Sequence, residues 1–323
     1  MCGIGGFYNT NGGKTPVSSI TSLWCALEDR GTHAHGMAFN WVNGDKPVVY
    51  KKVGAANKSK SVVKKYLSGK NLRYVLLHTR FTTQGSTHNM FNNHPIVRDG
   101  ITLTHNGVLR NDRQVFNQLN VKPLGEVDTE AINAALRHKG VKWTSEKIQG
   151  SMSIAWIDEK DSTQNVHLLT NGGNPLVIAR TFCGNIVWAS CLYHIEEAGF
   201  KILSHFNALP FKQYTLQPDG AIRSTWISKN RKMPNVNTWH SSHSNYYGNY
   251  DEESLDWDDM DWDDLYYANR GATSPSSSSS GGIVTQKKKG SKREPTNRQK
   301  AASNEWAYSK SRGWFKINDV DWY

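Results

Sequence analysis

The stretch MCGIGGFY at residues 1–8 carries the feature on which the interpretation of the whole chain rests. Cys2 follows the first methionine, and three glycines stand among apolar residues after it, a pattern typical of a short strand that other segments approach closely. Because the second residue is small, we expect Met1 to be removed, which leaves a thiol and an α-amino group on Cys2. An α-amino group has a reference pKa of ~7.7–8.0 and can accept the thiol proton near neutral pH. The pattern predicts a nucleophile that carries its own base.

Composition limits the class of protein. The 323 residues suffice for one large domain or two modest ones. A mean hydropathy of -0.63 and the lack of a run of ~20 apolar residues argue against a membrane-spanning protein. The first residues lack the basic and long apolar regions of a secretory signal, and the four cysteines are too scattered for a disulfide framework. We therefore expect a cytoplasmic location.

Charge is unevenly distributed along the chain. Residues 1–225 hold 25 basic and 15 acidic side chains, whereas residues 226–323 hold 14 and 13. A positive field favours acidic partners such as nucleic acid, and residues 51–73 are particularly basic, with eight Lys or Arg. No recognised nucleic-acid-binding motif accompanies this stretch, so a solvated face is the alternative interpretation.

Residues 1–225 have the pattern of a mixed α and β domain. A helix is indicated over residues 128–137, with Asp128 near its start, because Ile132 and Leu136 are four apart and acidic residues come first. The strand-like runs are RYVLLHTRF at 73–81, ITLTHN at 101–106, SMSIAWID at 151–158, PLVIAR at 175–180 and NIVWAS at 185–190.

Residues 226–323 have a different composition, rich in Asn, Ser, Tyr, Trp and blocks of like charge. Nine of the fourteen residues at 251–264 are acidic, and seven of the twelve tryptophans lie beyond residue 225. We expect this tail to be largely disordered because it has few aliphatic residues for a core. So much Trp favours docking motifs that become ordered on a partner or on the positive domain, and a tail without function is the alternative.

Six short segments occur in order along the first domain: CGIGGF at 2–7, RGTHAHG at 30–36, HTRFTTQG at 78–85, NNHP at 92–95, THNGVLRN at 104–111 and DTE at 128–130. In this order and spacing, residues 2–220 resemble the class II glutamine amidotransferase domain, an N-terminal-nucleophile hydrolase. The resemblance implies an α+β fold, a four-layer αββα sandwich. It also implies hydrolysis of glutamine through a γ-glutamyl thioester, with release of ammonia for transfer.

The resemblance assigns roles to particular residues. Arg80 is similar to the arginine that holds the α-carboxylate of glutamine, where a guanidinium matches two carboxylate oxygens. Asp128 is similar to the acid that pairs with the α-ammonium, and the two residues together would select free glutamine over a glutamine inside a peptide. Thr83 and Gln84, near Arg80 in sequence, are further candidate substrate-binding residues. An ordinary salt bridge is the alternative for Arg80 and Asp128.

Asn106 and Gly107 resemble the family's oxyanion hole, which combines a side-chain amide with a backbone N–H. We expect them in a turn after the ITLTH strand, since Asn-Gly is also typical of a tight hairpin turn. The two interpretations are compatible.

Three residues depart from the family's usual pattern: His33, His35 and Gln84. These changes leave open a different substrate or acceptor, or a degenerate site. Histidine is abundant in and near the motifs, but no spacing matches a zinc site, so we expect neutral core or pocket histidines, no metal and no cofactor. The histidines concerned are His33, His35, His78, His88, His94 and His105.

The 98 residues after Thr225 are too polar to fold as the synthase domain to which the family normally fuses this domain. We therefore expect a stand-alone glutaminase whose ammonia acceptor is a separate protein, with the tail as a candidate docking segment. Two alternatives stay open. One is a hydrolase of the same type that acts on another amide, and the other is an inactive binding module with this fold.

Overall fold

The computed structural model describes residues 1–44, 46–228, 306–309 and 313–316. The chain forms two units, residues 1–249 and 250–323. In the second unit, strands β14 (Trp306–Ser309) and β15 (Gly313–Lys316) pair antiparallel. The expected disorder and docking role of the tail otherwise concern residues outside the described ranges and stay predictions.

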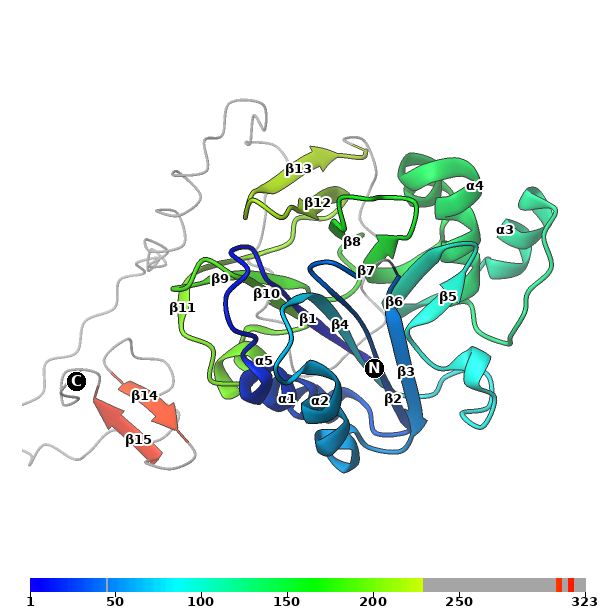
Figure 1. Ribbon diagram of the computed structural model, residues 1–323. Coiled ribbons are helices and arrows are strands. Elements are labelled where there is room, and N and C mark those ends of the chain that lie inside the picture. The colour runs from blue at the N-terminus through cyan, green and yellow to red at the C-terminus, as the bar shows by residue number, and fades with distance from the viewer. Residues whose placement is uncertain (45, 229–305, 310–312, 317–323) are drawn as a thin grey trace, which may run out of the picture. The chain divides into compact units, whose positions relative to one another are not determined.

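Two antiparallel sheets form the first unit (Figure 1). One sheet has seven strands in the order β11-β9-β10-β1-β4-β2-β3, and the other has six in the order β13-β12-β8-β7-β6-β5. The first sheet contains β1 (Gly3–Tyr8), β2 (Ala34–Trp41), β3 (Val48–Val53), β4 (Leu72–Arg80), β9 (Val177–Thr181), β10 (Ile186–Ala189) and β11 (Ile202–Asn207). The second contains β5 (Ile96–Arg98), β6 (Ile101–Leu109), β7 (Gly150–Asp158), β8 (Val166–Thr170), β12 (Lys212–Leu216) and β13 (Ile222–Trp226).

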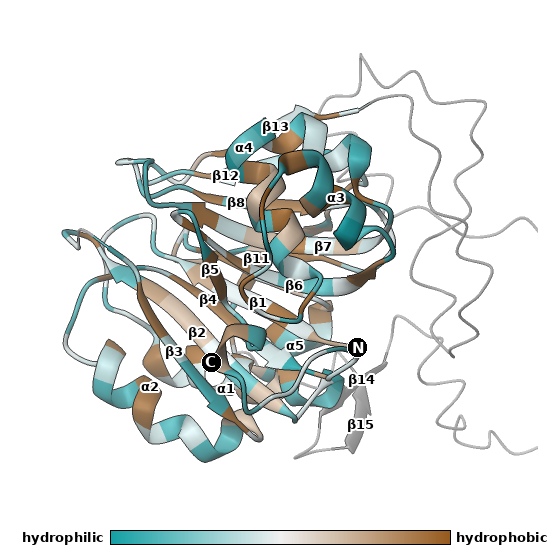
Figure 2. Ribbon diagram, turned by 90° about the vertical axis from the view of Figure 1, so that its right-hand side faces the viewer, coloured by the Kyte–Doolittle hydropathy of each residue, from teal (hydrophilic) through white to brown (hydrophobic). Residues whose placement is uncertain are grey.

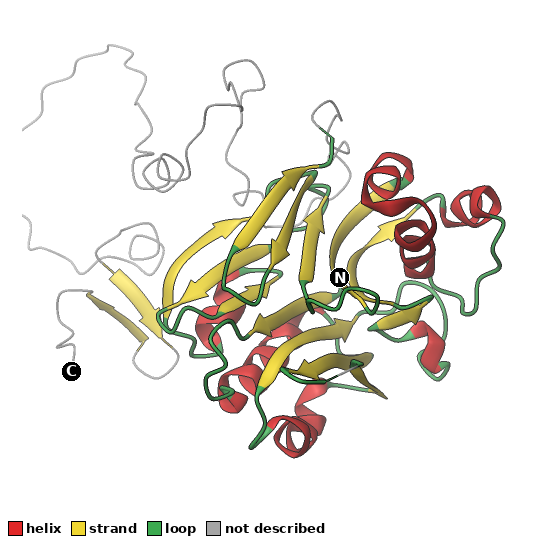
Figure 3. Ribbon diagram, turned by 45° about the horizontal axis from the view of Figure 1, so that its top comes forward, coloured by secondary structure: helices red, strands yellow, loops and turns green. Residues whose placement is uncertain are grey.

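Helices lie on the outer faces of the two sheets, as Figure 3 shows. The helices are α1 (Val17–Ala26), α2 (Lys60–Leu67), α3 (Asp112–Leu119), α4 (Thr129–Lys147) and α5 (Leu192–Glu197). Apolar residues of α1, α2 and α5 share one buried cluster with the first sheet, and those of α3 and α4 share another with the second. A third cluster joins the two sheets directly. These clusters make a four-layer αββα sandwich, as expected.

Strand β4 shows why the first sheet is covered on both faces. Successive side chains of a strand point to opposite faces. Val75 and Leu77 belong to the cluster under the helices, whereas Tyr74 and Leu76 belong to the cluster between the sheets. Figure 2 shows hydrophobic residues along the stacked strands and hydrophilic residues on α2, α3 and α4.

Strand β1 lies between β10 and β4 and has almost no space for side chains at its glycines. A Cβ atom on Gly6 would lie 2.1 Å from the Trp188 ring and 2.3 Å from the Val75 carbonyl oxygen. A Cβ atom on Gly3 would lie 2.5 Å from Thr79 Oγ1. The close approach expected from the glycine pattern is therefore present.

The expected strands and the helix at 128–137 are confirmed, with α4 beginning at Thr129 after Asp128. The expected turn at Asn106 and Gly107 is wrong. Both residues lie inside β6, which continues to pair with β7 as far as Leu109. The glycine instead allows close packing, since a Cβ on Gly107 would lie 2.0 Å from the Ser151 carbonyl oxygen.

The Gly6→Ala variant tests the packing around β1. The added methyl group has no space beside Trp188 and the Val75 backbone, so we expect the free energy of unfolding to fall by about 2–3 kcal/mol. Gly13→Ala is the matched control, because its Cβ would meet only the exposed Asn11 side chain at 3.0 Å. We expect a loss below ~0.5 kcal/mol there. Equal urea midpoints for the two variants would contradict the close packing described around Gly6.

Candidate active site

Cys2 lies directly before β1, at the edge where β4 ends. The pairing of Gly3 with Thr79 brings Cys2 beside the end of β4, and its thiol donates to the Phe81 carbonyl oxygen at 3.6 Å. Arg30 fixes the backbone here, because its Nε donates to the Cys2 carbonyl oxygen at 2.9 Å. The Met1 side chain is 54% exposed. One hydrogen bond of the thiol and one of the backbone therefore fix the position of Cys2.

The surroundings of Cys2 keep its thiol protonated at neutral pH. Burial raises the pKa of the thiol, and the positive charges of the N-terminal amine and Arg80 offset this only in part. With Met1 still present, partial burial lowers the pKa of the Met1 α-amino group. A base is therefore needed to generate the thiolate, which is the nucleophilic form.

A small pocket opens at Cys2. Its volume is ≈ 20 Å³, about the room of one water molecule. Six of the seven predicted site residues line it, and the seventh, Asn106, directly precedes Gly107 in β6. The lining residues are Cys2, Arg80, Phe81, Thr83, Gln84, His94, His105, Gly107, Val127, Asp128 and Thr129.

Arg80 connects this pocket to the loop that follows β4. Its Nη1 donates to Asn93 Oδ1 at 2.6 Å, and its Nη2 donates to the carbonyl oxygens of Gln84 at 2.5 Å and Gly85 at 3.0 Å. The guanidinium has five N–H donors, so these three bonds leave capacity for another acceptor. Arg80 thus holds the loop against the pocket in this conformation.

Asp128 connects the start of α4 to β6. Its Oδ2 accepts a hydrogen bond from the Leu109 backbone N–H at 2.7 Å, and the residue is 8% exposed. Arg80 and Asp128 attract each other electrostatically, without a direct ion pair between them among the described residues. The pocket wall therefore presents a cation and an anion near the thiol.

The side-chain amide of Asn106 is a buried hydrogen-bond donor. Its Nδ2 has no hydrogen-bond partner among the described residues, while its backbone carbonyl oxygen accepts from Asn174 Nδ2 at 3.1 Å. An unpaired buried donor costs about 1–3 kcal/mol, unless a ligand supplies an acceptor. Asn106 is therefore a donor available for an oxygen atom bound beside it.

Two histidines and a threonine form a hydrogen-bonded chain in the pocket wall. His105 Nε2 lies 3.3 Å from the Ser151 carbonyl oxygen, and a carbonyl only accepts, so the proton of the neutral ring is on Nε2. Its Nδ1 then accepts from the Thr129 hydroxyl at 2.9 Å, and the Thr129 oxygen accepts from His94 Nε2 at 3.0 Å. His94 Nδ1 is left as a buried acceptor without a partner among the described residues.

Burial keeps the histidines of this region neutral, as expected for pocket histidines. It lowers the pKa of His94 and His105, and it lowers that of His78 to about 3. The His78 ring stacks on His94 with centroids 4.1 Å apart, and its Nε2 donates to the His105 carbonyl oxygen at 3.1 Å. In the described ranges, no group of His, Cys, Asp and Glu could hold a metal ion.

The sequence interpretation did not assign roles to Arg30 or Thr129, or a specific role to His94. Arg30 belongs to the RGTHAHG segment and Thr129 to the DTE segment, so the motifs did contain them. The contacts described for them join residues 24 or more apart in sequence, which no local pattern shows.

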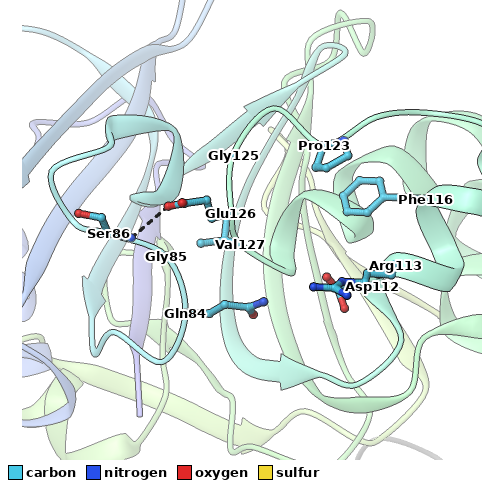
Figure 4. A pocket seen from close by; sticks show the side chains of 10 residues that line it. All are labelled: Gln84, Gly85, Ser86, Asp112, Arg113, Phe116, Pro123, Gly125, Glu126 and Val127. Atoms are coloured by element: carbon cyan, nitrogen blue, oxygen red, sulfur yellow. Dashed lines mark hydrogen bonds between the residues drawn. The ribbon is translucent and has the colours of Figure 1, made fainter.

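A second, larger cavity adjoins the first and shares Gln84 and Val127 with it. Its volume is ≈ 520 Å³, and Figure 4 shows the side chains that line it. The lining residues come from the loop after β4, from α3 and from the segment before α4: Gln84, Gly85, Ser86, Asp112, Arg113, Phe116, Pro123, Gly125, Glu126 and Val127.

Comparison with known proteins identifies related sequences. Residues 78–197 match a family described as glutamine amidotransferase domain. Glutamine–fructose-6-phosphate aminotransferase (isomerizing) of Thermotoga maritima is 28% identical over 191 residues, which cover 55% of this chain and 30% of that protein. The protein of the same name from Wigglesworthia glossinidia brevipalpis is 27% identical over 205 residues, covering 58% and 32%. The chain thus spans about a third of the curated relatives it matches.

Solved structures share the fold. Glutamine phosphoribosylpyrophosphate amidotransferase from B. subtilis superposes with a TM-score of 0.57 at 21% identity, over 71% of this chain and 50% of that chain. A structure described as the allosteric regulatory enzyme of purine biosynthesis gives the same TM-score at 20% identity and the same coverage. The chain shares the fold of these two structures, and the sequence matches support a glutamine amidotransferase domain that includes residues 78–197.

Thr129→Val tests the hydrogen-bonded chain. Valine keeps the shape but leaves His94 Nε2 and His105 Nδ1 unpaired, so we expect a loss of about 1–3 kcal/mol in the free energy of unfolding. Thr129→Ser keeps the hydroxyl and should therefore retain most of the free energy of unfolding of the parent. Urea unfolding measures both, and a valine variant as stable as the parent would show that the hydroxyl is not used.

The neutral histidines predict how stability depends on pH. The unfolded chain takes up protons on histidine below pH ~6.5, whereas the folded chain takes them up on His78 only near pH 3. The stability that comes from keeping these histidines neutral should therefore be fully present above pH ~6.5. Below that pH, the free energy of unfolding should fall by up to ~1.4 kcal/mol per pH unit for each histidine kept neutral. His78→Gln should flatten this slope in urea titrations at several pH values. His88→Gln, at an exposed position, should not.

Proposed function

We propose that this chain hydrolyses glutamine through a γ-glutamyl thioester on Cys2, releasing glutamate and ammonia. The observation that carries the proposal is the pocket that Cys2, Arg80, Gly107 and Asp128 line together. Asn106, which directly precedes Gly107 in β6, adds a buried amide without a partner among the described residues. The glutamine amidotransferase match over residues 78–197 supports the same chemistry.

The steps follow from the residues present. Once Met1 is removed, the Cys2 amine takes the proton of its thiol, and the thiolate attacks the γ-carboxamide carbon. Asn106 Nδ2 and the Gly107 N–H stabilise the resulting oxyanion. The protonated amine then gives its proton to the departing ammonia, and a water that the amine deprotonates cleaves the thioester. One base in this way serves both half-reactions.

Recognition of the amino-acid end is assigned to Arg80 and Asp128. Arg80 retains N–H donors for the α-carboxylate, and Asp128 supplies the charge opposite the α-ammonium. Thr83 and Gln84 complete the wall on the loop side. Because the pocket holds only about one water in this conformation, the loop that Arg80 anchors has to move when glutamine enters.

The ammonia acceptor is proposed to be an enzyme on a separate protein. Residues 226–323 include the candidate docking segment. A nucleic-acid partner for the basic stretch at 51–73 stays a prediction, as does the cytoplasmic location. None of the described helices is both long and apolar enough to cross a bilayer.

Asn106→Ala tests the oxyanion assignment. Its Nδ2 bonds to no described residue, so the variant should fold with nearly unchanged stability while kcat for glutamine falls about 10²–10³-fold. Glutamate release and urea unfolding are measured on the same sample. A variant with unchanged kcat would remove Asn106 from the mechanism.

The nucleophile is tested on the same preparation. Intact mass should show loss of Met1 and a single diazo-norleucine adduct, which Cys2→Ala abolishes and Cys183→Ala, at an exposed thiol, retains. Retained Met1 would exclude the amine as base. Turnover of another amide with little turnover of glutamine would favour a different substrate, and full function in Cys2→Ala would favour a binding module.

A further inference from the structure

His94 is a buried residue of the Cys2 pocket that the proposed reaction leaves without a role. It lies just before β5, lines the pocket and is 5% exposed. Its Nε2 donates to the Thr129 hydroxyl oxygen at 3.0 Å, so Nδ1 of the neutral ring is a hydrogen-bond acceptor. This Nδ1 is buried and has no partner among the described residues. Such an acceptor is unfavourable unless a bound molecule supplies a donor.

The neighbouring His78 provides a contrast. Its ring stacks on that of His94 with centroids 4.1 Å apart, and its Nδ1 is also buried without a partner in the described ranges. However, His94 lines the Cys2 pocket, and His78 is not among the lining residues. Of these two acceptors, the one on His94 is therefore the one that belongs to a residue in reach of a substrate.

The contacts of His94 place it at the amino-acid end of the bound glutamine. Its chain neighbour Asn93 accepts a hydrogen bond from Arg80 Nη1 at 2.6 Å, and Arg80 is assigned to the α-carboxylate. Its hydrogen-bond partner Thr129 directly follows Asp128, which is assigned to the α-ammonium. His94 is thus linked to both residues that recognise the amino-acid end.

The α-ammonium group is the donor that suits a neutral acceptor at this position. It has three N–H groups, whereas Asp128 already uses Oδ2 to accept from the Leu109 backbone N–H at 2.7 Å. A neutral imidazole nitrogen accepts an N–H of a cation, but an imidazolium would repel the cation and has no acceptor. Burial holds the pKa of His94 well below its usual value, and neighbouring groups such as Arg80 lower it further. The ring is therefore neutral when it meets the substrate.

We propose that His94 Nδ1 accepts a hydrogen bond from the α-ammonium group of glutamine, so that His94 and Asp128 together determine specificity for a free α-amino group. This inference rests on the proposed function and deepens its account of substrate recognition. The bond forms when glutamine binds and is kept while the Cys2 thiolate attacks the distant γ-carboxamide. It therefore contributes to substrate affinity and not to the rate of the chemical step.

The test compares KM for glutamine with the inhibition constant of glutaramate, the same amide without the α-amino group, against glutamine hydrolysis. In His94→Gln, the amide can reach Thr129 but leaves the position of Nδ1 without an acceptor. We expect KM for glutamine to rise about tenfold or more, because a hydrogen bond to a charged group is lost. The kcat for glutamine and the inhibition constant of glutaramate should change little, since neither depends on this bond.

Two further variants separate the acceptor from the fold of the loop. His94→Asn can place its amide oxygen near the position of Nδ1 while it gives up the bond to Thr129, so it should keep most of the affinity for glutamine. His88→Gln, at an exposed position of the same loop outside the pocket lining, should leave both constants unchanged. Urea unfolding of each sample shows whether the variant is folded.

A spectroscopic measurement needs no variant. In the unaltered protein labelled with 15N-histidine, the Nδ1 resonance of His94 should shift when glutamate binds, because Nδ1 then accepts a hydrogen bond. Glutarate, which lacks the α-amino group, should leave that resonance in place. This comparison decides the question if neither His94 variant folds.

The outcomes separate this inference from the proposed function. An equal rise of KM and of the glutaramate inhibition constant in His94→Gln would show a structural role alone and overturn the inference, while glutamine turnover in the parent leaves the glutaminase intact. An unchanged KM, equal losses in the two His94 variants, or an Nδ1 resonance that glutamate does not shift would also overturn it. Absence of glutamine turnover in the parent, together with no diazo-norleucine adduct on Cys2, would overturn the proposed function and this inference with it.

Discussion

The close packing of β1 between β4 and β10 is the constraint on which the rest of the structure depends. Glycine at positions 3 and 6 lets neighbouring backbone and the Trp188 ring approach to distances that no side chain would permit. This packing sets the pairing of Gly3 with Thr79, and hence brings Cys2 beside the start of the Arg80 loop. A wider strand would displace the sulfur from the cation and from the donors of β6.

A buried, neutral polar network complements that packing on the other side of the pocket. Thr129 joins His94, which precedes β5, to His105 of β6, and each bond requires a defined tautomer. Networks of this kind hold a site rigid only when every member is paired. Among the buried atoms without a partner in the described ranges are Asn106 Nδ2, His78 Nδ1 and His94 Nδ1, and His94 lines the pocket, where a ligand can satisfy it.

The order of motifs in the sequence anticipated much of this arrangement. The strands, the helix that follows Asp128 and the sandwich architecture agree with the expectations, because alternation and helix-start signals are local properties of the chain. The turn predicted from the Asn-Gly pair was wrong. Both residues have a local preference for a turn, but β6 continues to pair with β7 as far as Leu109. Tertiary hydrogen bonds outweighed the intrinsic preference.

The sequence by itself determined a cysteine at position 2, an amide donor at Asn106 and charges at Arg80 and Asp128, because residue types and their order are fixed covalently. Only the tertiary structure decided that Arg80 anchors its own loop, that Thr129 bridges two histidines, and that a second, larger cavity shares Gln84 and Val127 with the Cys2 pocket. These features join groups from different strands and helices. Their energies depend on distance, burial and shared hydrogen bonds, which exist only after the two sheets have packed together.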